Sequence, residues 1–156
     1  MGHDGSVWRS AGIALFVLVA CSSNAATEPP LLPAGVVVFD GSERLNVRIA
    51  ETEQERETGL MHVMALAPDD GMAFVFDGPV TETFWMKDTL IPLSVAFVGE
   101  DGRVVSIADM EPCEADPCPT YAATGPYTLA VEANLGWFAD HSVAAGDPAR
   151  LEADDG

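Results

Sequence analysis

The apolar and polar positions of this chain alternate in short stretches that are typical of strands. From Leu45 to Ile49, apolar residues occupy every second position, which is the pattern of a half-buried strand. Similar runs recur along the chain, and Gly99–Gly102 has the composition of a hairpin turn between two of them. The pattern predicts strands at residues 36–39, 45–50, 72–76, 83–87, 93–98, 103–108 and 127–132, with a last one near residue 151.

One short helix is predicted in the N-terminal third of the chain. Thr52 and Glu55 have the spacing of a capping box, and Gly59 is a typical helix stop. A single helical turn is also expected over residues 135–138. Many short strands separated by turns predict a mainly β fold, either a β-sandwich or an open barrel-like single domain with one short helix near the N-terminal third.

The N-terminal segment has the pattern of an export signal. The apolar run from Ala11 to Val19 is too short to cross a membrane but has the size of a signal-peptide core. Leu18–Cys21 resembles a bacterial lipobox, so we expect cleavage before Cys21 and lipidation of its thiol. An ordinary secretory signal with Cys21 merely nearby is the alternative. The predicted organisation is a lipoprotein signal peptide (1–20), a flexible tether (21–35) and a β-rich domain (36–156) outside the cytoplasm, anchored to the cell membrane.

The strongly negative net charge of the chain excludes nucleic acids as partners. The 156 residues include 25 acidic and 7 basic ones, for a net charge of −18, so the electrostatic field of the protein repels nucleic acid. Hydrophobic residues make up 48%, which excludes wholesale disorder. Lys87 is the only lysine in the sequence. Any basic site in this chain therefore depends on very few side chains.

The two remaining cysteines predict a structural disulfide. Cys113 and Cys118 lie in a loop with three prolines, and an exported domain would meet an oxidising environment. The spacing differs from that of a thioredoxin-type redox pair, and no further soft ligands lie nearby for a metal. Only His62 and His141 remain after removal of residues 1–20. We therefore expect neither a metal nor a cofactor.

Several segments in a fixed order carry a family resemblance. They are 55–61 (ERETGLM), 71–76 (GMAFVF) and 84–93 (FWMKDTLIPL), followed by 96–98, 101–107 and 127–132. The chain from Leu45 to Leu151 resembles the domain of unknown function 192 family. The resemblance implies a mainly β, sandwich-like fold and a protein that is exported or lipoprotein-linked, with no established activity. The chain departs from the family pattern at Val63, where arginine is usual, and at Asp88 and Ser94, where asparagine and aspartate are usual.

The segment around Lys87 is the candidate site. If residues 83–87 form a strand, Trp85 and Lys87 lie on one face and form an aromatic wall beside an ammonium group. Such a wall would suit a small anionic or sugar-like ligand. The plainer alternative pairs Lys87 with a carboxylate and packs Trp85 in the core. The candidate binding residues are Trp85, Lys87, Asp88, Thr89, Gly59, Met61 and Tyr121.

We therefore expect an exported, membrane-anchored lipoprotein that serves as a small-ligand binding or accessory module of the cell envelope. An envelope carbohydrate-active enzyme that uses Asp88 and Glu132 as acid and base is one alternative. A structural or partner-binding domain without a pocket is another. The usual sequence signals of hydrolases are absent from the chain, which weighs against the enzyme.

Overall fold

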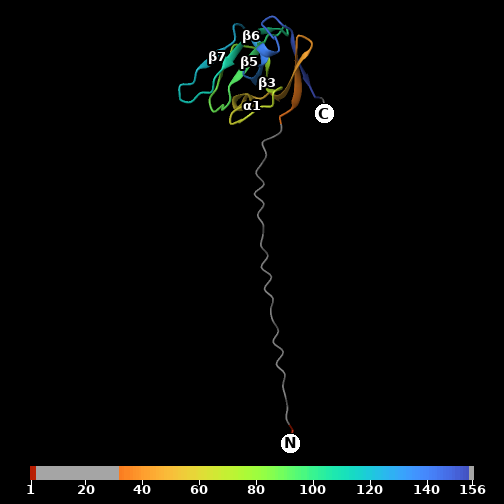
Figure 1. Ribbon diagram of the computed structural model, residues 1–156, viewed down its shortest axis with the longest axis vertical. Helices are drawn as coiled ribbons and strands as arrows, with labels where there is room; N and C mark the ends of the chain where they lie inside the picture. The colour runs from red at the N-terminus through yellow and green to blue at the C-terminus, as the bar shows by residue number, and fades with distance from the viewer. Residues whose placement is uncertain (3–31, 155–156) are drawn as a thin grey trace. The chain divides into compact units, whose positions relative to one another are not determined.

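The computed structural model describes residues 1–2 and 32–154 (Figure 1). Most of the predicted signal peptide, Cys21 and most of the predicted tether lie outside the described residues. No helix in the described part of the chain is both long and apolar enough to cross a membrane.

The described residues form nine strands and two short helices (Figure 1). Their bounds are β1 (Ala34–Phe39), β2 (Glu43–Ala50), α1 (Glu53–Thr58), β3 (Asp70–Val80), β4 (Thr83–Trp85), β5 (Leu93–Val98), β6 (Val104–Met110), β7 (Thr120–Ala122), β8 (Tyr127–Asn134), α2 (Trp137–Asp140) and β9 (Ala149–Ala153). Seven strands form one sheet in the order β6-β5-β8-β3-β2-β1-β9, and β4 pairs with β7 in a second, small sheet. All neighbours are antiparallel except β2 and β3, which are parallel and are connected through α1.

The large sheet curves so that its two edge strands meet at one corner. Arg103, just before β6, forms an isolated bridge with Pro148, just before β9. The Val104 amide donates to the Asp147 carbonyl at 2.9 Å at the same corner. The remaining lengths of β6 and β9 are not paired with each other, so the barrel is open. The predicted mainly β fold, with a short helix in the N-terminal third, is confirmed.

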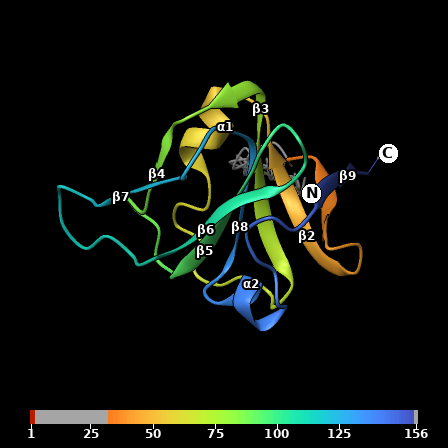
Figure 2. The same cartoon turned by 90° about the horizontal axis from the view of Figure 1, so that it is seen from above.

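The two faces of the sheet carry two separate hydrophobic clusters. The first cluster is built around Phe39, Trp137 and Phe138, whose rings pack with centroids 5.4–5.9 Å apart. The second cluster lies on the side of α1 and β4 and contains Phe74 and Tyr127. Because side chains alternate along a strand, the central strands β3, β5 and β8 contribute to both clusters. In Figure 2, α1 and α2 lie at opposite ends of the view.

Three local features differ from or add to the sequence-based expectations. The strand predicted at residues 83–87 ends at Trp85, and β7 was not predicted because it has only three residues and depends on β4 for pairing. The final helical turn begins at Trp137, slightly later than expected. The disulfide between Cys113 and Cys118 is confirmed, with the two Cα atoms 5.5 Å apart.

Candidate functional site

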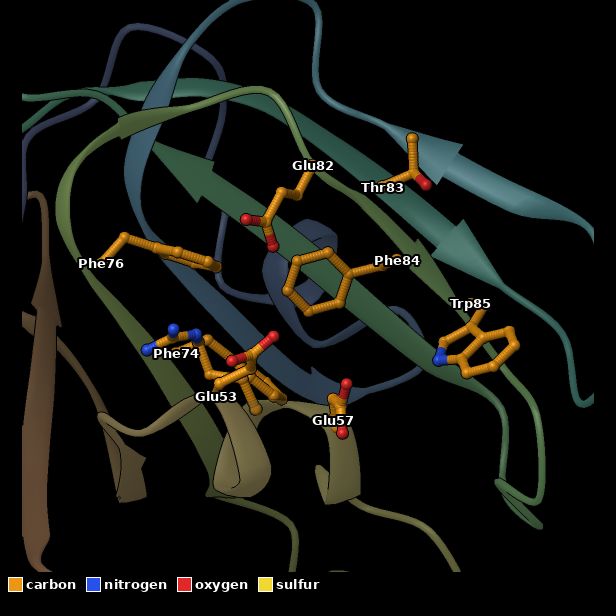
Figure 3. Close-up of a pocket in the computed structure, with 9 residues that line it drawn as sticks. Glu53, Glu57, Phe74, Phe76, Glu82, Thr83, Phe84 and Trp85 are labelled. Atoms are coloured by element: carbon orange, nitrogen blue, oxygen red, sulfur yellow. The ribbon is translucent and has the colours of Figure 1, made fainter.

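A groove of about 300 Å³ lies between α1 and the strands β3 and β4 (Figure 3). Four aromatic side chains, three carboxylates, an arginine and a threonine line it. They are Phe74, Phe76, Phe84 and Trp85, with Glu53, Glu57 and Glu82, and with Arg56 and Thr83. Figure 3 shows the Phe84 ring in the middle of this group, between the helix that carries Glu53 and Glu57 and the strand that leads to Trp85.

Local sequence signals hold α1 in place beside the groove. The Thr52 hydroxyl accepts from the Glu55 amide at 3.3 Å, and the Glu55 carboxylate accepts from the Thr52 amide at 2.9 Å, which completes the predicted capping box. These backbone hydrogen bonds to the carboxylate hold the pKa of Glu55 below its usual value. Gly59 ends the helix with a φ of +46°, and a Cβ there would lie 3.4 Å from the Phe74 ring.

Arg56 ties the helix to the sheet. Its guanidinium lies 4.8 Å from the centre of the Phe76 ring and donates to the Val75 carbonyl at 3.0 Å and to the Glu51 carbonyl. Among the described residues it forms no ion pair with a carboxylate within 4.0 Å. The guanidinium of Arg56 is therefore already engaged by the Phe76 ring and by backbone carbonyls of the same chain.

The aromatic floor of the groove is held by edge-to-face packing. The Phe84 ring lies 5.1 Å from Phe74 and 5.5 Å from Phe97, measured between centroids. Tyr127 packs beneath this group, and its hydroxyl donates to the Glu82 carbonyl at 3.0 Å. Burial, together with the nearby charge of Glu82, raises the pKa of Tyr127 to about 12. The turn that carries Glu82 at the rim is thus anchored to the second cluster.

The groove adjoins a smaller, deeper cavity of about 30 Å³ that includes Glu132. The two cavities share Arg56, Glu57, Phe74, Phe84 and Trp85, and the deeper one is also lined by Gly59, Met61 and Thr89. Three of these residues, Gly59, Met61 and Thr89, were predicted as site residues from the sequence. The structure therefore brings them together with Trp85.

Glu132 is the most unusual group of the site. It is only 5% exposed and lies in the middle of the sheet, where its strand neighbours are Met72 on β3 and Val95 on β5. These neighbours are apolar, so burial raises the pKa of Glu132 to about 8. Among residues 32–154, no hydrogen bond or ion pair to the Glu132 carboxyl is found. No unpartnered polar side-chain atom of the described residues is fully enclosed, so the Glu132 oxygens keep some accessible surface, and Glu132 lines the small cavity.

Lys87 lies outside the groove and the smaller cavity that Trp85 lines. The Lys87 ammonium is 5.4 Å from the centre of the Trp85 ring, so the aromatic wall beside an ammonium group is present. However, the strand ends at Trp85 and Asp88 adopts a φ of +55°, so Lys87 and Asp88 line a separate cavity of about 110 Å³ beside the disulfide loop. The plainer alternative is not found, since Trp85 is 47% exposed and no carboxylate of the described residues lies within 4.0 Å of Lys87.

Two further sequence-based candidates do not meet the site. Tyr121 is paired with Phe84 across the small sheet, and its hydroxyl accepts from the Glu111 amide at 3.2 Å, but it lines neither the groove nor the deeper cavity. Asp88 and Glu132 line different cavities. The paired carboxylates across one cleft that glycoside hydrolysis requires are therefore not formed by these two residues.

Sequence reasoning missed most of the groove. Arg56, Glu57 and Phe84 come from a helix and a strand whose meeting depends on the fold, so no local spacing connects them. Glu132 has a local signal, because it is the one charged residue in the apolar run from Leu129 to Ala133. In the described part of the chain, no three His, Cys, Asp or Glu side chains are grouped as a metal site would require.

The fold and the groove define a small, mainly β domain with a mixed seven-stranded sheet. The family model DUF192 (Uncharacterized ACR, COG1430) matches residues 36–151, and the chain belongs to this family. Val63, Asp88 and Ser94 all fall inside the matched range, so the departures at these positions do not remove the chain from the family.

Two solved structures are similar to this chain. One is a protein described as a putative transcription regulator from Sinorhizobium meliloti 1021, with 28% identity and a TM-score of 0.72 over 80% of this chain and 98% of the other. The second is a protein of unknown function from Novosphingobium aromaticivorans DSM 12444, with 34% identity and a TM-score of 0.67 over 76% of this chain and 83% of the other. Among curated proteins, nothing matches.

Proposed function

We propose that this chain is an exported lipoprotein, anchored to the cell membrane through a lipid on Cys21, whose domain binds a small ligand in the groove beside α1. The short apolar run and lipobox-like segment before Cys21 support export and anchoring. The disulfide of Cys113 and Cys118 is consistent with folding in an oxidising compartment. The tether would hold the binding domain away from the membrane surface.

The observation that carries ligand binding is the groove itself. Its volume of about 300 Å³ is at the lower end of the range for small-molecule sites. Four aromatic side chains supply apolar faces, and carboxylates at the rim supply hydrogen-bond acceptors. A half-exposed indole such as that of Trp85 is costly to leave in water, and a ligand that stacks on it would remove that cost.

The charge of the groove selects against an anionic ligand. Three carboxylates line it, on Glu53, Glu57 and Glu82, against the single guanidinium of Arg56. Lys87, which was expected to attract an anion, lies in another cavity. Of the anionic and sugar-like ligands that the sequence suggested, a sugar-like molecule fits this groove, and so does a cationic one.

Nucleic acid binding is not part of the proposal. One similar structure is described as a putative transcription regulator, but that description belongs to the other protein. The net charge of −18 works against contact with a phosphate backbone in this chain.

Ligand binding is tested with a lipid-free chain carrying Cys21→Ser. A screen of neutral, cationic and anionic small molecules by Trp fluorescence and NMR should yield ligands that perturb Trp85 and Phe84. Trp85→Ala should weaken them at least tenfold, while Tyr121→Phe, outside both cavities, should leave their affinity unchanged. Ligands that bind equally well to Trp85→Ala would contradict the groove as the site.

Anchoring is tested in a bacterial host that processes lipoproteins. The natural chain should partition with membranes and incorporate labelled fatty acid, and Cys21→Ser should lose both properties. Ser22→Ala, which keeps Cys21 and the segment before it, is the matched control and should remain lipidated. Membrane retention of the Cys21→Ser chain would defeat this half of the proposal.

A further inference from the structure

Glu132 lines the smaller cavity beside the groove, and its carboxyl has no counter-ion among the described residues. We infer that this deep cavity is a subsite for the ammonium group of an organic amine, with the Glu132 carboxylate as its counter-ion. The inference rests on the proposed ligand-binding groove and names the chemical class of its ligand.

Residues 32–154 supply no partner for the Glu132 carboxyl. On the sheet, its neighbours Met72 and Val95 are apolar and buried. Thr89 is close enough to line the same cavity, but its hydroxyl donates to the Lys87 carbonyl at 3.3 Å. Buried carboxyl groups in folded proteins normally have a hydrogen-bond or charge partner. A carboxyl that opens into a cavity without one is suited to receive a donor from a ligand.

The charged groups around the cavity favour a cation in that position. Apart from Glu132, the charged side chains that line it are Arg56 and Glu57, both on α1, while β3 and β4 contribute aromatic rings. Arg56 is held by two backbone carbonyls and the Phe76 ring, so it does not neutralise Glu132. Glu57 adds a second negative charge. Once Glu132 is ionised, the cavity holds two carboxylates against one guanidinium that is already engaged, so a ligand cation supplies the counter-charge.

The cavity walls are also suited to an ammonium group. Phe74, Phe84 and Trp85 line the cavity together with the Glu132 carboxyl. Aromatic faces attract cations through their quadrupole, most strongly where water is excluded. The combination of aromatic faces and one carboxylate is the arrangement that recognises organic ammonium ions.

The volumes of the two cavities determine which amines fit. The deep cavity of about 30 Å³ is comparable with the space of one water molecule, so it takes a primary ammonium group. The adjoining groove of about 300 Å³ takes the rest of the ligand against its aromatic floor. The ligand class is thus a primary amine on a ring or short alkyl body, and amino sugars belong to it.

Binding should be linked to a proton. Because burial raises the pKa of Glu132 to about 8, its carboxyl is mostly protonated in the free protein at pH 7. An ammonium ligand stabilises the carboxylate, so the Glu132 proton passes to solvent when the amine binds. Affinity for the amine should therefore rise about tenfold or more between pH 6.5 and 8.5, and calorimetry in buffers of different ionisation enthalpy should detect the released proton.

The experiment compares three molecules with one body and different head groups. Cyclohexylmethylamine, cyclohexylmethanol and cyclohexanecarboxylate are titrated into the lipid-free chain and followed by NMR. The amine should bind at least tenfold more tightly than the alcohol, and the carboxylate should bind most weakly. Glu132→Gln should weaken the amine at least tenfold, leave the alcohol within about threefold, and remove the pH dependence. Glu100→Gln is the matched control, since this residue lines none of these cavities.

The outcomes separate the two proposals. Equal affinity for amine and alcohol, or an amine affinity unchanged in Glu132→Gln, overturns the ammonium subsite but leaves a ligand-binding groove. If no primary amine or matched alcohol in a wider set perturbs Trp85 or Phe84, both the subsite and the groove are overturned. Circular dichroism of each variant shows that the fold is retained.

Discussion

The two faces of the large sheet differ in what they bury. The first cluster, around Phe39, Trp137 and Phe138, is closed by α2, and the polar residue buried beside it, Ser94, accepts from the Gly136 amide at 2.8 Å. The second cluster, around Phe74 and Tyr127, borders the groove and has the Glu132 carboxyl beside it. One strand serves both faces, because β8 points Val131 into the first cluster and Glu132 towards the other side.

This difference separates stability from binding. An apolar, closed cluster contributes free energy of folding in proportion to the surface that it removes from water. A buried carboxyl without a partner lowers the stability of the fold, and such a cost is typical of positions held for a ligand. The hydrophobic side chains of the two clusters supply the stability that offsets the cost of the buried Glu132 carboxyl.

The largest expected effect on stability comes from a substitution in the first cluster. Phe39→Ala removes a ring that is fully buried and touches both Trp137 and Phe138, so it should lower the free energy of unfolding by about 3–5 kcal/mol. Urea denaturation measures the loss. Under conditions where the variant is folded, its groove should still bind the wild-type ligands. A loss below about 1 kcal/mol would contradict a tightly packed first cluster around the Phe39 ring.

A substitution on the second face, at Glu132, should raise the free energy of unfolding instead. Glu132→Gln removes a carboxyl whose pKa of about 8 in the folded chain exceeds its usual 4.5. Below pH 4.5 both states of the natural chain hold the proton. Between pH 4.5 and 8 only the unfolded chain loses it, so the stability of the natural protein falls as pH rises. Glu132→Gln should therefore be more stable by roughly 2–4 kcal/mol at pH 9 and show little gain at pH 4.

Denaturation of both chains across this pH range measures the difference. Glu100→Gln removes a surface charge of the same kind and should follow the natural chain at every pH. A Glu132→Gln gain that does not change with pH would contradict the raised pKa of Glu132.

A smaller effect on stability is expected at Tyr127, whose hydroxyl holds the turn that carries Glu82 at the rim of the groove. Tyr127→Phe removes the hydroxyl that donates to the Glu82 carbonyl at 3.0 Å, while the buried ring stays in place. The free energy of unfolding should fall by about 1–2 kcal/mol, and ligand affinity should fall because Glu82 is less well held. Thermal denaturation and ligand titration measure the two effects. Unchanged values of both would show that this hydrogen bond does not position the rim.

The smallest effect on stability is expected at the residue with the largest expected effect on binding. Trp85 is 47% exposed, so Trp85→Ala should change the free energy of unfolding by less than about 1 kcal/mol. Its loss from the groove should nevertheless weaken ligands at least tenfold, as ligand titration would show. A variant that loses stability and keeps affinity would reverse the division of roles between the two faces.

Most of the fold could be predicted from local patterns in the sequence. The alternation around Leu45–Ile49 and the capping box of Thr52 and Glu55 each predicted an element that the structure contains. The strand β7 could not be predicted, because three residues are too few to show the alternation of a strand. Its pairing with β4 also joins segments that are far apart in the sequence. The meeting of the sheet edges at Arg103 and Pro148 also depends on curvature that no local pattern encodes.

The candidate site was accessible only in part. Trp85, Thr89, Gly59 and Met61 belong to segments that the sequence singled out, and all four line the small cavity. Lys87 lines another cavity, because β4 ends two residues before it. The groove between α1 and β4 depends on how distant segments pack, so spacing along the chain could not reveal it. Glu132 was visible as a charge in an apolar run, but its buried environment follows from the two strands beside it.

The most direct measurement is an NMR titration of the Glu132 side-chain carboxyl carbon in the ligand-free, lipid-free chain. We expect a midpoint near pH 8, because the carboxyl lies between apolar strands and faces an otherwise unpartnered cavity. A saturating primary amine should move the midpoint to lower pH, because the ammonium favours the carboxylate. A midpoint near the ordinary value of 4.5 in the free protein, unchanged by amines, would contradict a buried, ligand-receptive carboxyl at this site.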